Sequence, residues 1–182
     1  MFQIFGPKTV YSTKLAFIGL GKLGLPCAEC FVQKGFDVSG YDIGSVSTNF
    51  VTRFQTLAGA IRKRDLIFVA VPTPHEIGYD GGTPSSHLPV KDFDYTIVKE
   101  TLKEINNYIT PEQTVILIST VLPGTIRKEL APLLPNNVLL YNPYLIAMGT
   151  VENDVLNPEM IMIGSDKSKK SAPKLEVLES FY

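Results

Sequence analysis

The sequence has few of the features that mark several classes of protein. Its 182 residues include no tryptophan and only two cysteines, which cannot build a disulfide framework. The 17 lysine and arginine residues are balanced by 18 aspartate and glutamate residues, so no basic excess attracts nucleic acid. No apolar run reaches the roughly 18 residues of a membrane span, and Met1 to Lys14 lacks a secretory signal pattern. We therefore expect a cytoplasmic globular protein with no nucleic-acid or membrane partner.

What the chain does contain is an alternation of short apolar runs and helical patterns. Mostly apolar segments of strand length cover residues 15–18, 66–71, 114–118 and 138–141, and residues 36–41 are also interpreted as a strand. Apolar or small residues recur at helical spacing over residues 23–34, 95–105 and 125–134. This alternation predicts a doubly wound parallel sheet with helices on both faces, a three-layer α/β/α arrangement. The length suits a single domain.

Several segments fit this pattern less well. Residues 44–59 carry serines and threonines where a second crossover helix belongs, so a third strand, with residues 50–54 as its candidate, stays open. The apolar run Met160 to Ile163 predicts a further edge strand, and residues 169–181 predict a polar terminal helix. We interpret residues 1–13 as a leader and residues 14–182 as the domain.

A glycine-rich turn, Gly19-Leu20-Gly21-Lys22-Leu23-Gly24, follows the first expected strand and opens the first expected helix. In this context Gly19 suits a tight turn, Gly21 lets the backbone approach a pyrophosphate, and Gly24 lets helix and strand pack closely. Free amides at the start of the helix, with its dipole, favour phosphate. The turn predicts a dinucleotide site on a Rossmann fold; the alternative is a glycine-rich turn without a ligand.

Asp42 ends the second expected strand, where a carboxylate accepts hydrogen bonds from both ribose hydroxyls of adenosine. The negative charge would repel a 2′-phosphate, and no arginine follows immediately, so we expect NAD rather than NADP. The alternative is an exposed turn aspartate before Gly44.

Two later loops, one with Pro72 and Thr73 and one with Thr120, also follow expected strands. Ligands of open α/β sheets bind outside the carboxyl ends of the strands, so both loops should border the same crevice as the glycine turn. For each threonine alone, a local turn or capping role is an equally good interpretation.

With these residues the chain resembles the N-terminal NAD-binding domain of the UDP-glucose/GDP-mannose dehydrogenase family, from about Lys14 to Tyr182. The matching motifs are Phe17 to Pro26, Val69 to Pro74, Ser119 to Val121 with Pro123 to Thr125, Asn142-Pro143, Gly149-Thr150 and Leu156 to Pro158. Such enzymes oxidise the C6 hydroxyl of a nucleotide sugar twice, to a carboxylate, using two NAD and a thioester on a cysteine. The resemblance and the turn together assign NAD contacts to Gly19, Leu20, Gly21, Lys22, Leu23, Gly24, Asp42, Pro72, Thr73 and Thr120. Thr120, expected nearest the reacting carbon, is the candidate catalytic residue.

The chain also departs from the family pattern. The family's nucleophilic cysteine and its lysine and asparagine partners lie in later domains, which this sequence does not contain. The family's Asn-Pro-Glu-Phe-Leu-Arg-Glu-Gly is here the segment from Asn142 to Gly149, with Met148 in place of the second glutamate. A stretch of the family sequence between Asp42 and the helix around Ala60 is missing, which removes part of the adenine wall. The resemblance therefore implies a chain that holds NAD but needs another domain or chain to act on a nucleotide sugar.

Two other arrangements of reactive residues are weaker candidates. Cys27 and Cys30 have thioredoxin-like spacing, but they fall on the packing side of the first helix, so we expect two buried thiols. His75, His87 and Asp80 share a loop without a fixed spacing, so we expect no metal site.

Three functions remain to be weighed. The leading one is the NAD-binding domain of a nucleotide-sugar 6-dehydrogenase, as a fragment, a split-enzyme subunit or a degenerate relative. The second is a non-catalytic NAD-binding or partner-binding module derived from that family. The third is a small β-hydroxyacid or 6-phosphogluconate type of dehydrogenase, against which Pro72-Thr73-Pro74 and Asn142-Pro143 argue. The sugar and the oligomeric state, including a homo-oligomer or a split-enzyme partner, are not specified by the sequence.

Overall fold

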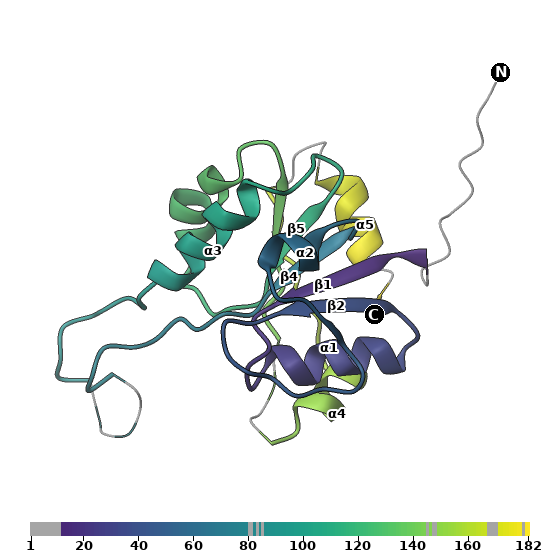
Figure 1. The fold of residues 1–182 in the computed structure, drawn as a ribbon. Coiled ribbons are helices and arrows are strands. Elements are labelled where there is room, and N and C mark those ends of the chain that lie inside the picture. The colour runs from purple at the N-terminus through teal and green to yellow at the C-terminus, as the bar shows by residue number, and fades with distance from the viewer. Residues whose placement is uncertain are drawn as a thin grey trace.

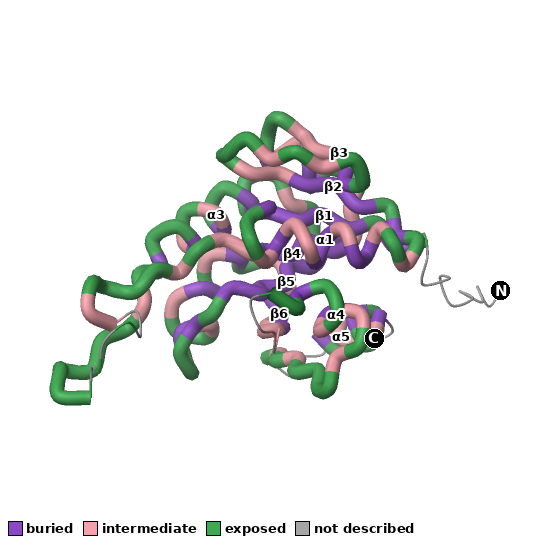
Figure 2. Tube along the Cα trace, turned by 90° about the horizontal axis from the view of Figure 1, so that it is seen from below, coloured by how far each residue is buried: buried purple, intermediate pink, exposed green. Residues whose placement is uncertain are grey.

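The computed structural model describes residues 12–79, 82, 84, 86–144, 146, 149–166, 171–179 and 181–182. These residues form a six-stranded parallel sheet in the order β3-β2-β1-β4-β5-β6 (Figures 1 and 2). The strands are β1 Lys14–Ile18, β2 Asp37–Tyr41, β3 Thr52–Arg53, β4 Leu66–Val69, β5 Thr114–Leu117 and β6 Val138–Tyr141. The helices are α1 Gly24–Gln33, α2 Leu57–Ile61, α3 Thr96–Asn106, α4 Val151–Leu156 and α5 Ala172–Glu179, with two short helical turns, η2 Ile126–Leu130 and η3 Ala131–Leu133.

The central strands are buried on both faces, which is why their sequences are continuous apolar runs. Side chains on one face of the sheet, such as Phe17 and Phe68, pack with α1, α4 and α5. Those on the other face, such as Ile67 and Val115, pack with α2, α3, η2 and η3. The doubly wound three-layer arrangement expected from the sequence is therefore confirmed, and Figure 2 shows buried stretches along the strands.

The third strand, left open by the sequence, does form, as the two-residue strand β3 beside β2. The first helix ends as expected at Gly35, whose φ is 92° and whose N–H donates to the carbonyl of Val32. The terminal helix is α5, and the parts of this prediction at residues 169–170 and 180 lie outside the described residues.

Two expected elements were wrong in detail. The strand expected over Met160 to Ile163 does not form; only an antiparallel bridge joins Gly164 to Tyr141. The Asn142 side-chain amide donates to the carbonyl of Met162 at 2.9 Å, so a side chain rather than a strand ladder holds this segment at the end of β6. The helix expected over residues 125–134 is instead the π-helical turn η2 followed by the 3₁₀ turn η3, because Pro132 has no N–H to continue an α-helix.

Candidate functional site

The glycine turn is held by contacts that exclude larger residues at two of its three glycines. Gly19 has a φ of 93°, and a Cβ there would lie 2.4 Å from the carbonyl oxygen of Ala70. A Cβ on Gly24 would lie 1.9 Å from the carbonyl oxygen of Gly19. A Cβ on Gly21 would meet no atom within 4 Å. The first and third glycines therefore let strand, turn and helix pack together, whereas the second leaves open space above the turn.

Asp42, directly after β2, is tied to this turn by its carboxylate. Its Oδ2 accepts the backbone N–H of Leu20 at 2.7 Å, and its Oδ1 accepts the backbone N–H of Gly44 at 2.7 Å. Each carboxylate oxygen has a further lone pair, so the group can still accept hydrogen bonds from a ligand. The same bond to Gly44 also agrees with the turn role that the sequence left open for Asp42.

Arg53 on β3 also contacts this loop, which the sequence did not indicate. Its Nη2 donates to the carbonyl of Gly44 at 2.6 Å. The guanidinium is thus engaged with the backbone of the loop that follows Asp42.

A cavity of about 590 Å³ lies against the glycine turn. Eight of the ten residues predicted to contact NAD line it: Gly19, Gly21, Lys22, Leu23, Asp42, Pro72, Thr73 and Thr120. Leu20 is 2% exposed and Gly24 is buried beneath the turn, and neither lines the cavity. The structure thus brings residues from the ends of β1, β2, β4 and β5 to one site, as expected for a parallel sheet.

The loops after β4 and β5 are joined at the cavity. The Ser119 hydroxyl donates to the carbonyl of Val71 at 2.7 Å, which fixes the two loops relative to each other. Thr73 is half-buried and Thr120 is exposed in the cavity wall. Thr120, the candidate catalytic residue, is therefore placed at the carboxyl end of β5 with its side chain accessible.

The cavity has further walls that the sequence did not reveal. They include Tyr41 and Ile43 beside Asp42, Leu57 from α2, and Ile97, Thr101 and Glu104 from α3. Leu57 and the three α3 residues were missed because they belong to helices distant in sequence from the glycine turn, whereas Tyr41 and Ile43 simply flank Asp42. The spacing of the three α3 residues, which places them on one helical face, was the available signal.

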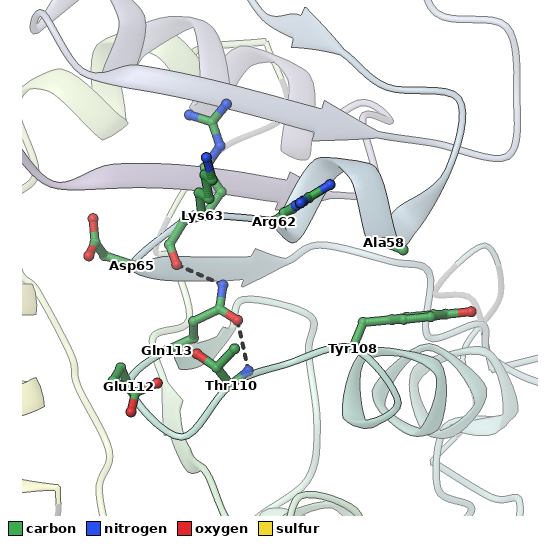
Figure 3. A pocket seen from close by; sticks show the side chains of 9 residues that line it. Ala58, Arg62, Lys63, Asp65, Tyr108, Thr110, Glu112 and Gln113 are labelled. Atoms are coloured by element: carbon green, nitrogen blue, oxygen red, sulfur yellow. Dashed lines mark hydrogen bonds between the residues drawn. The ribbon is translucent and has the colours of Figure 1, made fainter.

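A second cavity, of about 540 Å³, lies at the opposite edge of the sheet (Figure 3). It is lined by the segments just before β4 and β5, including Arg62, Asp65 and Gln113. The Gln113 amide is engaged inside the protein: it donates to the carbonyls of Ile61 and Arg64, each at 2.7 Å, and accepts the N–H of Thr110. This cavity lies at the amino ends of the strands, so it lacks the arrangement that binds dinucleotides in such sheets.

Both cysteines are buried in α1, as expected, with exposures of 0%. Burial is the main cause that raises the pKa of each thiol, most strongly for Cys27. Neither therefore resembles a reactive thiolate, which needs a lowered pKa and access to solvent.

The metal prediction falls partly outside the described residues, because Asp80 is not among them. His75 packs its ring against Phe93, with centroids 4.5 Å apart. Within the described parts of the chain, no group of three histidine, cysteine, aspartate or glutamate residues is placed to hold a metal ion. In those same parts no helix combines the length and apolar character that crossing a membrane requires.

Comparison with known families agrees with this geometry. The model of the UDP-glucose/GDP-mannose dehydrogenase family, NAD binding domain, matches residues 44–182. The chain belongs to this family. Its cofactor is NAD. The matched region begins after the glycine turn, so the turn and Asp42 support the cofactor independently of that match.

Individual relatives extend the likeness over nearly the whole chain. The GDP-mannose 6-dehydrogenase of Pseudomonas putida is 23% identical, and the match covers 93% of this chain and 43% of the relative. The UDP-N-acetyl-D-mannosamine dehydrogenase of Methanococcus vannielii is 26% identical, and the match covers 92% of this chain and 42% of the relative. The crystal structure of a ternary complex of GDP-mannose dehydrogenase from Pseudomonas aeruginosa shares the fold, with a TM-score of 0.74, 21% identity, and coverage of 92% and 44%. The NAD-binding domain described here thus spans less than half the length of these relatives.

Proposed function

We propose that this chain is the NAD-binding part of a nucleotide-sugar 6-dehydrogenase, in which the C6 hydroxyl of the sugar is oxidised to a carboxylate. The observation that carries the proposal is the single cavity shared by the glycine turn and the Asp42 carboxylate. Its volume and lining fit a dinucleotide: Gly21 leaves space for a pyrophosphate, and Asp42 retains lone pairs for ribose hydroxyls. When bound, NAD supplies the acceptor for the hydride removed from the sugar.

In this proposal different residues of the chain bind different parts of NAD. The turn from Gly19 to Gly24 binds the pyrophosphate with backbone amides at the start of α1. Asp42 binds the adenosine ribose and repels a 2′-phosphate, so NAD is preferred over NADP. Pro72 and Thr73 border the far side of the crevice, and Thr120 contacts the nicotinamide half beside the reacting carbon.

We further propose that the sugar and the nucleophile are handled by another domain or chain. Cys27 and Cys30 are the only cysteines in this sequence, and both are buried with raised pKa values, so neither suits a thioester-forming nucleophile. Met148, where the family pattern has glutamate, lies outside the described residues. A split-enzyme partner or a longer polypeptide would supply the missing groups.

Calorimetric titration of this chain with NAD and NADP, alongside Asp42→Ala, tests the cofactor assignment. NAD should bind more tightly than NADP, and Asp42→Ala should weaken NAD binding by about tenfold or more, as expected for lost hydrogen bonds to a charged group. No detectable NAD binding, or tighter binding of NADP, would overturn the assignment.

A second experiment tests whether another domain or chain must supply the sugar site and the nucleophile. The chain is incubated with NAD and UDP-glucose, GDP-mannose or UDP-N-acetylmannosamine, and NADH is followed by absorbance. We expect no NADH from this chain alone, and NADH once a polypeptide carrying the family's later domains is added. NADH produced by this chain alone would contradict the proposal.

The second candidate is a non-catalytic NAD-binding or partner-binding module. It is favoured by the short crossover after Asp42, where Phe50 is 63% exposed outside the cavity lining and offers apolar surface to a partner. NAD binding without NADH formation in the presence of any such polypeptide would support this candidate over the first.

A further inference from the structure

One wall of the NAD cavity is formed by a single face of α3. Ile97, Thr101 and Glu104 line the cavity, and their spacing of four and then three residues places them on the same side of the helix. Leu57 of α2 lines the same cavity, and α2 packs against β1, β2 and α3. The α3 wall is therefore continuous with α2, which packs against β2, the strand that Asp42 follows.

The polar groups on this wall are hydrogen-bond acceptors. The Thr101 hydroxyl donates its proton to the carbonyl of Ile97 at 2.8 Å, which leaves only its lone pairs for a ligand. The ionised Glu104 carboxylate can only accept. Glu104 takes part in none of the ion pairs formed among the described residues. The wall is thus complementary to a ligand group that donates, such as an amine.

Apolar side chains flank these acceptors. Ile43 and Ile97 are 95% and 40% exposed at the cavity, and the buried Leu57 lies on α2. Apolar side chains left this exposed beside a cavity mark a surface that a ligand covers. A flat heterocycle with an amine on its edge satisfies both the apolar and the acceptor parts of this region.

We propose that Glu104, together with Thr101, recognises the exocyclic 6-amino group of the adenine ring, and so selects adenine dinucleotides over those with a 6-oxo purine. The inference rests on the proposed function, because it places the adenosine ribose at Asp42. Since the base is joined to that ribose, it lies in the part of the cavity next to Asp42. A 6-oxo purine presents an oxygen at this position, which two acceptors repel.

The test compares NAD with nicotinamide hypoxanthine dinucleotide, in which a carbonyl replaces the 6-amino group. Binding of both to the full chain is measured by calorimetry for the wild type, Glu104→Gln and Glu100→Gln. Glu104→Gln exchanges an acceptor for a group that can also donate to the carbonyl. Glu100→Gln removes the same charge one turn earlier on α3, at an exposed position outside the cavity lining.

The wild type and Glu100→Gln should bind NAD about tenfold more tightly than the hypoxanthine dinucleotide. In Glu104→Gln this preference should fall to about threefold or less. A wild type without preference, or an equal preference in all three proteins, overturns the role of Glu104 while NAD binding and the proposed function stand. Binding of neither dinucleotide to the wild type overturns the proposed function and this inference together.

Discussion

The backbone N–H of Leu20 donates a 2.7 Å hydrogen bond to Oδ2 of Asp42, and so links the glycine turn after β1 to the end of β2. The bond joins two residues that are 22 positions apart in the sequence. The other carboxylate oxygen accepts the N–H of Gly44, so the one side chain links the glycine turn to the loop after β2.

This link predicts that Asp42 stabilises the folded state, in addition to the role in NAD binding proposed above. Asp42→Ala leaves two backbone N–H groups without their partner, and because Asp42 is only half-buried we expect a loss of about 1–2 kcal/mol in the free energy of unfolding. Asp42→Asn keeps one oxygen acceptor and should fall between Asp42→Ala and the wild type. Urea denaturation without ligand measures all three; an Asp42→Ala protein as stable as the wild type would refute the structural role.

The glycines of the turn predict two different effects of the same substitution. Gly24→Ala places a Cβ 1.9 Å from the Gly19 carbonyl oxygen, so backbone must shift, and we expect the fold to lose about 2 kcal/mol or more. The Cβ that Gly21→Ala adds has no protein atom within 4 Å, so the free energy of unfolding should be nearly unchanged. The methyl group does occupy space above the turn, so NAD binding by Gly21→Ala should weaken.

Calorimetry and urea denaturation of both variants separate the two effects. If Gly21→Ala bound NAD as well as the wild type, the pyrophosphate would not approach the backbone at this turn. If Gly24→Ala kept full stability, the close contact between turn and helix would not limit the fold.

Much of this site follows from local sequence rules. A buried strand, a glycine turn and a helix must be adjacent in space because they are adjacent in the chain, and strand ends such as Asp42 and Thr120 meet because the sheet is parallel. The wall formed by Leu57 and Glu104 depends instead on how α2 packs against α3, which is a tertiary property. The segment at Met160 also depends on tertiary contacts: the Asn142 side chain donates to the carbonyl of Met162, and a single bridge joins Gly164 to Tyr141.

The burial of Cys27 and Cys30 predicts that neither thiol reacts in the folded chain. Burial raises both pKa values, so little thiolate forms near neutral pH and reagents have no access. Iodoacetamide at pH 8, followed by mass spectrometry, should leave the native protein unmodified and alkylate both thiols in denaturing urea. Rapid alkylation of the native protein, or a disulfide between the two after mild oxidation, would contradict this structure.

A partly buried polar cluster attaches the last residues of the sequence to the core. Tyr182 donates to Oδ1 of Asn142 at 2.6 Å, and its oxygen lies 2.8 Å from the Tyr144 hydroxyl, which donates to it. The neighbouring Phe181 stacks on Phe36 with ring centroids 4.6 Å apart. Burial is the main cause that raises the pKa of Tyr144 and of Tyr182.

This cluster predicts a loss of stability at alkaline pH. The unfolded chain releases tyrosine protons near pH 10, whereas the folded chain keeps those of Tyr144 and Tyr182 to higher pH. The folded state then binds more protons than the unfolded state, so the contribution of these tyrosines to the free energy of unfolding is constant below about pH 9 and falls as pH rises through 10. The buried thiols of Cys27 and Cys30 add a fall that begins earlier, because unfolded thiols release their protons at about pH 8.5. A pKa that is raised in the folded state always lowers the free energy of unfolding as pH rises past the pKa of the unfolded chain.

Urea denaturation between pH 7 and pH 11 measures the effect, with two tyrosine variants for comparison. Tyr182→Phe removes one titrating group, so its stability should be about 1–3 kcal/mol lower at pH 7 but fall less steeply above pH 10. Tyr108→Phe, at a side chain that is 54% exposed, should keep the wild-type dependence on pH. A Tyr182→Phe protein with the same alkaline slope as the wild type would show that the carboxyl-terminal tyrosine does not hold its proton in the fold.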